Sequence, residues 1–155
     1  MKPLQIMLIA GEASGDLLAA ELVGALREEL IAGESTYTRD LQPLKTALEP
    51  RFFGAGGPRM KAAGVALAVD LTQHSVTGFS DVAKNYFKFR RLFLQLLQLA
   101  IERQPDVIIG VDYGGFNLRF AHAVRRYVRS RSPWFHGWRP KLVQYVSAQI
   151  CASPA

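Results

Sequence analysis

A glycine-containing turn near the N-terminus carries three polar side chains that could contact a ligand. The residues Gly11 to Asp16 follow an apolar run and precede a helical pattern. Backbone N–H groups at a helix start favour an anion such as phosphate. Glu12 and Asp16 weaken a plain phosphate site, but suit recognition of sugar hydroxyls or helix capping. Ligand binding by Glu12, Ser14 and Asp16 and a simple tight turn are both open interpretations. The turn lacks the G-x-G-x-x-G pattern and the P-loop lysine, which disfavours both kinds of nucleotide site.

Asp112 is the candidate general base. It ends a second apolar run, and Tyr113 to Asn117 follow it. A partly shielded carboxylate at the end of a strand can take the proton of a hydroxyl group. Asn117 could bind a ligand or cap the next helix. The alternative interpretation is that Asp112 itself only caps that helix.

A second glycine-rich turn, Gly54 to Met60, carries one cation, Arg59. A guanidinium beside such a turn can bind a phosphate through two parallel hydrogen bonds. The alternative is a surface arginine on a short helix.

The segment from Lys84 to Arg103 mixes cations with aromatic residues. Its polar residues share one helical face, and its apolar residues fill an arc broader than the ~100° stripe of a core-facing helix. An interfacial membrane helix, or a path for an acylated ligand, has this composition. An ordinary buried helix at a domain interface is the alternative. The candidates for membrane contact are Phe87, Lys88, Arg91 and Phe93.

Short apolar runs that alternate with helical patterns must position these residues. Strands are predicted at 4–10, from 51, at 65–71, 106–111 and 142–146, and helices at 14–30, 58–63, 81–103 and 116–131. This alternation predicts an α/β fold, a Rossmann-like three-layer structure with a parallel sheet. Ligands bind beyond the carboxyl ends of such strands. The turn after residue 10 and Asp112 are therefore natural site positions. The polar stretch 31–50 is predicted to be a surface insertion.

Composition limits the domain count and the partners. The 155 residues, 49% of them hydrophobic, suit a single domain spanning 1–155. The net charge of +6 favours a phosphorylated ligand, an anionic membrane or nucleic acid, or it only aids solubility. The single cysteine, Cys151, excludes an intrachain disulfide, and no apolar run reaches the ~18 residues that span a bilayer. No metal site is expected, because metal-ligand spacing is missing from the three histidines: His74, His122 and His136.

Six short motifs follow one another along the chain. They are AGEASGD at 10–16, GGPRM at 56–60, SVTGF at 75–79, PDVIIGVD at 105–112, FN at 116–117 and YVS at 145–147. Together they resemble the lipid-A-disaccharide synthase family, in the family's order and at near-family spacing. Each motif is weak alone, but the set in register is specific.

The resemblance implies inverting transfer of 2,3-diacylglucosamine from its UDP-linked donor to the 6-hydroxyl of 2,3-diacylglucosamine 1-phosphate. It implies a GT-B-type fold of two Rossmann-like halves, with this chain as the N-terminal, acceptor-side half. By motif match, Asp112 becomes the general base, Glu12, Ser14 and Asp16 line the cleft, and Asn117 supports it. No metal or other cofactor and no nucleic acid is expected. The expected location is peripheral, on the cytoplasmic face of the inner membrane, and a homodimer is a further expected assembly.

Three departures from the family pattern qualify this expectation. Gly114 stands where the family commonly has Pro, and Ala148 to Ala152 replace the family's usual Pro-Gln-Val-Trp-Ala. The C-terminal donor-binding half is expected to be absent from a chain that ends at Ala155. An alternative function is therefore a catalytically inactive domain that binds only acylated ligand or membrane. A further alternative is an unrelated Rossmann-like nucleotide binder.

Overall fold

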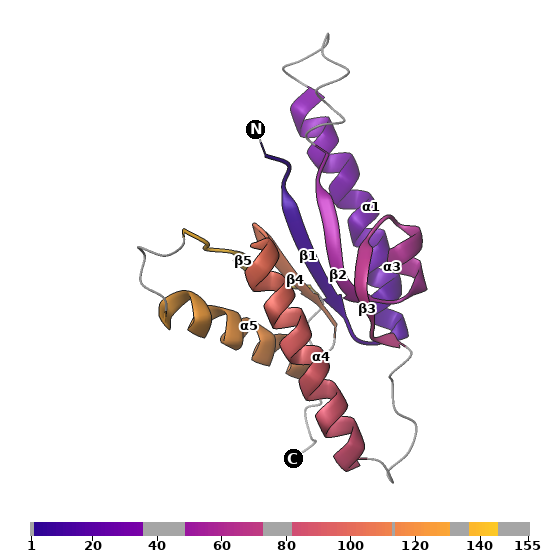
Figure 1. Cartoon of the computed structure of the whole chain (residues 1–155). Helices are drawn as coiled ribbons and strands as arrows, with labels where there is room; N and C mark the ends of the chain where they lie inside the picture. The colour runs from indigo at the N-terminus through magenta and orange to yellow at the C-terminus, as the bar shows by residue number, and fades with distance from the viewer. Residues whose placement is uncertain (1, 36–48, 73–81, 113, 131–136, 146–155) are drawn as a thin grey trace, which may run out of the picture.

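In a computed structural model of the chain, five parallel strands form one sheet between two layers of helices (Figure 1). The structure describes residues 2–35, 49–72, 82–112, 114–130 and 137–145. The strand order is β3-β2-β1-β4-β5. The strands are β1 (Gln5–Ala10), β2 (Arg51–Gly56), β3 (Ala66–Asp70), β4 (Val107–Val111) and β5 (Lys141–Tyr145), and the helices are α1 (Ala13–Ser35), α3 (Pro58–Ala62), α4 (Val82–Arg103) and α5 (Gly114–Ser130).

The predicted α/β, Rossmann-like three-layer class is confirmed, and each predicted strand and helix has a counterpart. Two helix boundaries were wrong by two residues or more, because α1 continues through residues 31–35 instead of ending at residue 30, and α5 begins at Gly114 instead of residue 116. Ile31 and Ala32 tolerate a helix, and Gly33 costs only about 1 kcal/mol relative to alanine. Residues 36–48 of the predicted insertion lie outside the described residues.

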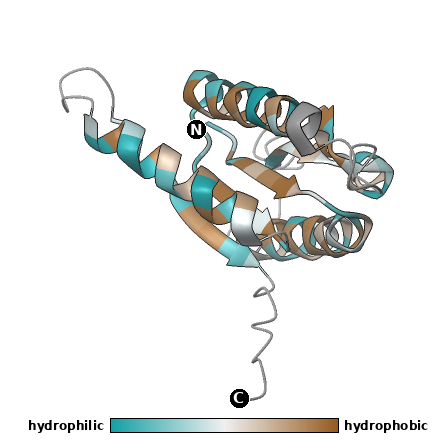
Figure 2. Cartoon of the chain, turned by 90° about the horizontal axis from the view of Figure 1, so that it is seen from below, coloured by the Kyte–Doolittle hydropathy of each residue, from teal (hydrophilic) through white to brown (hydrophobic). Residues whose placement is uncertain are grey.

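The central strand β1 is buried on both faces, and its side chains alternate between two cores. Ile6 and Leu8 pack with residues of α1 and α3. Met7 and Ile9 pack with residues of α4 and α5. In Figure 2 the strands are largely brown and lie between helices that carry both brown and teal residues. Burial on two faces explains why the sequence of β1 is continuously apolar rather than alternating.

All five strands run in the same direction, so their carboxyl ends share one edge of the sheet, called the carboxyl edge below. In the register of β1 with β4, Ile9 lies opposite Gly110 and Ala10 opposite Val111. The turn after β1 therefore lies beside Asp112. Figure 1 shows the first turns of α4 extending past this edge.

The packing of α4 on the sheet can be tested with a pair of leucines on that helix. Leu96 is fully buried, whereas the side chain of Leu94 is 52% exposed. We expect Leu96→Ala to lower the free energy of unfolding by about 2–5 kcal/mol, because it leaves a cavity in the core. Leu94→Ala should change it by less than about 0.5 kcal/mol. Urea denaturation measures both values, and equal losses would contradict this orientation of α4 on the sheet.

Candidate functional site

The carboxylate of Asp112 lies at the carboxyl edge, beside the start of α1. Ser14 donates a hydrogen bond from Oγ to Oδ2 of Asp112 at 3.1 Å. Gly15 eases this approach, because a Cβ there would lie 3.3 Å from the carbonyl oxygen of Val111, closer than most Cβ contacts. The N-terminus of α1, with the partial positive charge of a helix start, thus lies near this carboxylate. Two sequence motifs whose bonded residues are 98 positions apart thus meet at the carboxyl edge.

The backbone of Asp112 is held by two neighbouring elements. Its φ is 51°, in the left-handed region. Its N–H donates to the carbonyl oxygen of Tyr145 in β5 at 3.0 Å. Its own carbonyl oxygen accepts from Nδ2 of Asn117 at 2.5 Å and from Nε2 of Gln144 at 3.4 Å. Neither the contact of Gln144 nor the left-handed conformation was predicted, since nothing in the sequence of β5 distinguishes this glutamine from an ordinary strand residue.

Asp16 is 3% exposed and binds backbone groups of the second glycine-rich turn. Its Oδ1 accepts from the N–H groups of Gly57 at 3.0 Å and Met60 at 2.9 Å, and its Oδ2 accepts from the N–H of Arg59 at 3.0 Å. These N–H groups surround the start of α3, where a helix lacks internal acceptors. Asp16 therefore caps α3 and joins it to α1. Substrate binding by Asp16 stays a prediction, and this use of both oxygens does not favour it.

Glu12 and Arg59 are exposed at the same edge of the sheet. Glu12 precedes α1, and its carbonyl oxygen accepts from the N–H of Asp16 at 2.9 Å. Arg59 is placed by the bond from its N–H to Asp16, and its side chain is exposed. The structure thus brings Glu12, Ser14, Arg59 and Asp112 to one edge. Contact between each of these four residues and a ligand remains a prediction.

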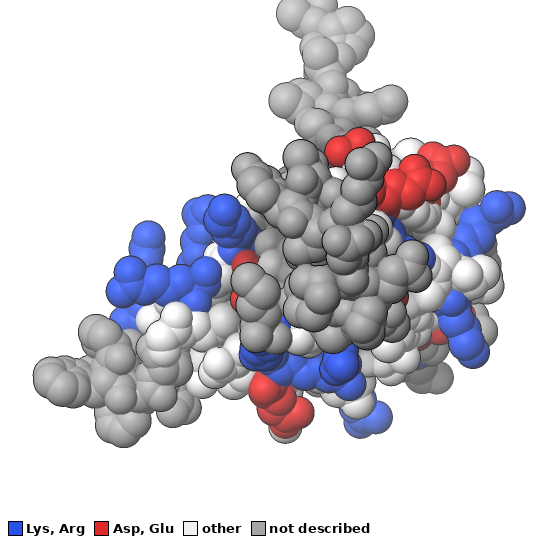
Figure 3. Space-filling view, turned by 90° about the horizontal axis from the view of Figure 1, so that it is seen from above, with Lys and Arg blue, Asp and Glu red and all other residues white. Residues whose placement is uncertain are grey.

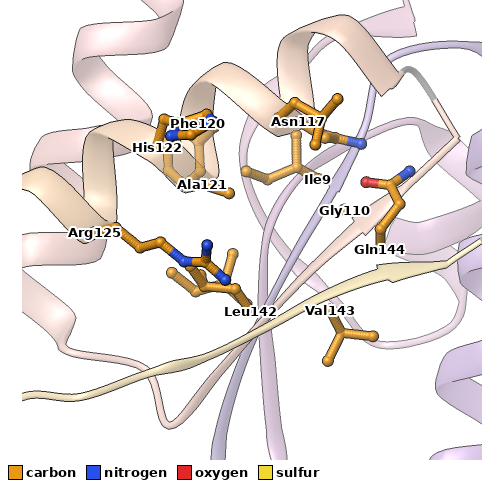
Figure 4. Close-up of a pocket in the computed structure, with 12 residues that line it drawn as sticks. Ile9, Gly110, Asn117, Phe120, Ala121, His122, Arg125, Leu142, Val143 and Gln144 are labelled. Carbon is orange, nitrogen blue, oxygen red and sulfur yellow. The ribbon is translucent and has the colours of Figure 1, made fainter.

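A pocket of about 200 Å³ lies between α5 and β5 (Figure 4), and its lining includes Asn117 and Gln144, which bind the carbonyl oxygen of Asp112. Its walls are mainly apolar. Gln144 extends from β5 toward Asn117, and Arg125 extends from α5 toward β5. Asn117 is 5% exposed, and within the described part of the chain no donor reaches its Oδ1. The predicted cap by Asn117 is therefore not formed with any described N–H group, and its amide nitrogen binds Asp112 instead.

Positive charge gathers on α5, which carries no acidic residue. Figure 3 shows a group of Lys and Arg side chains on the left, at the end of the molecule where α5 lies. Part of the net charge is therefore concentrated on one surface instead of being evenly spread. The exposed cations of this helix are Arg119, Arg125, Arg126 and Arg129.

The predicted membrane-contacting residues of α4 fall into two groups. Phe87 is 69% exposed, and Lys88 and Arg91 are also exposed. Phe93 is partly buried, with its ring edge-to-face to Phe116 and Phe120 at centroid distances of 5.5 and 5.6 Å. Membrane contact by Phe93 stays a prediction, and this packing does not favour it. Within the described ranges, no helix is both long and apolar enough to cross a bilayer.

Comparison with known proteins decides the family. A sequence profile described as lipid-A-disaccharide synthetase matches residues 6–152. The chain belongs to the lipid-A-disaccharide synthase family. It is 33% identical to a lipid-A-disaccharide synthase of Trichlorobacter lovleyi over 97% of this chain and 32% of the relative. It is 37% identical to one of Geobacter sulfurreducens, over 96% of this chain and 31% of the relative.

This family consists of glycosyltransferases of the GT-B type, in agreement with the Rossmann-like sheet. The chain spans about a third of the length of the curated relatives it matches. A lipid-A-disaccharide synthase of Myxococcus xanthus is 36% identical over 98% of this chain and 37% of its own length. Among the residues that the structure describes, no three His, Cys, Asp or Glu side chains are placed to hold a metal ion.

The hydrogen bonds of Asp16 give a stability prediction. Asp16→Ala removes the acceptor for three N–H groups, two of them in buried bonds. We expect the free energy of unfolding to fall by on the order of 3 kcal/mol, since buried donors without acceptors are costly. Glu21→Ala, at an exposed position of the same helix, serves as the control. Urea denaturation of both variants compares the losses, and a loss no larger than that of the control would show that the cap contributes little.

Proposed function

We propose that this chain is the acceptor-side half of a transferase that makes the lipid A disaccharide. It would present 2,3-diacylglucosamine 1-phosphate to a UDP-linked 2,3-diacylglucosamine donor. The observation that carries the proposal is the partly exposed Asp112 carboxylate at the carboxyl edge, bonded to Ser14 of the family's first motif. Family membership supports this class of reaction.

In the proposed reaction, Asp112 acts as the general base. Its Oδ2 is bonded to Ser14, and among the described residues no donor is bonded to Oδ1. The second oxygen would take the proton of the acceptor 6-hydroxyl as that hydroxyl oxygen attacks the donor anomeric carbon. The new glycosidic bond forms on the face opposite the bond that breaks, and UDP leaves with its electron pair. Such proton transfer contributes about 10²–10⁴ in rate.

The other residues proposed to contact substrate fall into an exposed group and a buried group. Ser14, which is bonded to Asp112, and Glu12, which precedes α1 at the same edge, are both exposed, and this exposure supports hydrogen bonding to sugar hydroxyls. Arg59 is exposed near the α1 N-terminus, where a guanidinium would pair with phosphate. Asp16 and Asn117 are buried and bonded to backbone, which supports an indirect role for both.

The exposed first half of α4 is proposed to lie on the cytoplasmic surface of the inner membrane. Aromatic and basic side chains side by side suit the boundary between headgroups and acyl chains. The exposed members are Tyr86 and Phe87 with Lys88, Arg90 and Arg91. Such contact would keep the site close to its acylated substrates. A homodimer remains a further proposal.

A second candidate function is supported by the coverage of the relatives. Because this chain corresponds to about a third of their length, groups that bind the donor in them are expected outside the matched part. The chain alone would then bind acylated ligand or membrane without turnover. Inverting transfer requires both substrates to be held in reactive geometry, which argues that half a cleft contributes little alone.

Replacement of the proposed base distinguishes the two functions. We expect Asp112→Asn to lower the rate of disaccharide formation by about 100-fold or more, because asparagine cannot accept the proton. The assay follows a radiolabelled UDP-linked donor into product, with Glu21→Gln as an exposed control. If the purified unaltered chain forms no product, independent catalysis is wrong and the binding function is favoured. If Asp112→Asn matches the unaltered rate, Asp112 is not the base.

Charge reversal on α4 tests the membrane proposal. We expect Lys88→Glu with Arg91→Glu to lower binding to vesicles containing anionic lipid by about ten-fold or more, since each cation near such a surface contributes about 1 kcal/mol. The matched control is Arg51→Glu with Lys61→Glu, which makes the same charge change at exposed positions outside α4. Vesicle flotation measures both. Equal losses would show that only net charge matters, and unchanged binding would refute the electrostatic contact.

A further inference from the structure

Asp112 has a backbone conformation that needs an explanation. Among the described non-glycine residues, only Gln104 and Asp112 have a positive φ, of 48° and 51°. Gln104 directly follows α4, and left-handed residues are common where helices end. Asp112 follows a strand instead, so this general reason does not apply to it. A left-handed non-glycine residue costs on the order of 1–3 kcal/mol and persists where its surroundings hold it.

The residue best placed to hold Asp112 is Asn117. The carbonyl oxygen of Asp112 can only accept, so the Asn117 atom that binds it must be the amide nitrogen, which fixes the orientation of the amide. The side chain is 5% exposed and is therefore confined to this position. Gln144 adds a longer bond to the same oxygen.

Gly110 provides the space in which Asn117 lies. A Cβ at Gly110 would lie 2.7 Å from Cγ, and 2.8 Å from both Cβ and Nδ2, of Asn117. The amide thus rests directly on the backbone of β4, two residues before Asp112. Any larger residue at position 110 would push the amide away from the carbonyl that it binds.

We propose that Asn117, seated on Gly110, is a positioning residue that holds Asp112 in its left-handed conformation and so sets the direction of its carboxylate. The first part of this proposal, that Asn117 holds the φ of Asp112, can be tested without any sugar transfer. Its consequence for sugar transfer rests on the proposed function. Asn117 would act on the acceptor through Asp112, without touching the acceptor itself.

The conformational part is tested by NMR on the labelled chain. The three-bond HN–Hα and one-bond Cα–Hα couplings of Asp112 report its φ. We expect both to shift to the values of a negative φ in Asn117→Leu, which keeps the branched shape but has no donor. Gly110→Ala should have the same effect. Gly115→Ala is the matched control, because a Cβ there would have no neighbour within 4 Å. Left-handed couplings that persist in folded Asn117→Leu would overturn the proposal.

The functional part is tested by steady-state kinetics of sugar transfer. We expect Asn117→Leu to lower kcat by about 100-fold with little change in KM, because a displaced base slows the reaction more than it weakens binding. An altered φ with an unchanged kcat would overturn the positioning role. If the unaltered chain transfers no sugar, independent catalysis by this chain is wrong, and the couplings still decide the conformational part. Thermal unfolding of each variant identifies any that do not fold.

Discussion

The pairing of β1 with β4 determines where the chemistry of this molecule can occur. Ala10 lies opposite Val111, so the residues that follow the two strands emerge next to each other at the carboxyl edge. Both strands are buried, and a slip of one residue would turn every side chain to the opposite layer. The register is therefore fixed by the two cores. The hydrogen bond between Ser14 and Asp112 depends on it, although these residues lie far apart in sequence.

Asp16 connects the start of α1 to the loop that follows β2. It lies one half-turn of α1 beyond Ser14, and its carboxylate faces the start of α3 instead of Asp112. The loops after β1, β2 and β4 are thereby joined at one edge. The two aspartates differ in exposure and in bonding. Asp16 is buried with both carboxylate oxygens bonded to N–H groups, whereas Asp112 is partly exposed. This contrast is the main physical reason to place the base at Asp112 and a structural role at Asp16.

The fold was predictable from sequence because strands buried on both faces and amphipathic helices leave strong local patterns. The placement of Asp112 beside the first turn also followed, since parallel strands end at one edge. The partners of Asp16 and Asn117 did not follow. A sequence pattern shows that a polar residue begins a helix, but not which distant N–H or carbonyl group it meets. The inward packing of Phe93 was missed for a related reason, because a broad apolar arc on α4 does not show which part of it the neighbouring helix α5 covers.

The position of α4 relative to the sheet connects the two halves of the functional proposal. Its first turns extend past the carboxyl edge (Figure 1), and Asp112 lies at this edge because it directly follows β4. If these turns lie on a bilayer, the carboxyl edge faces the lipid headgroups. An acylated sugar could then reach Asp112 while its chains remain in the membrane, so the substrate would not have to be fully extracted. A base at the opposite edge of the sheet would lack this access. Membrane contact and proton transfer therefore make a consistent proposal, since α4 packs on the same sheet that carries Asp112 at its carboxyl edge.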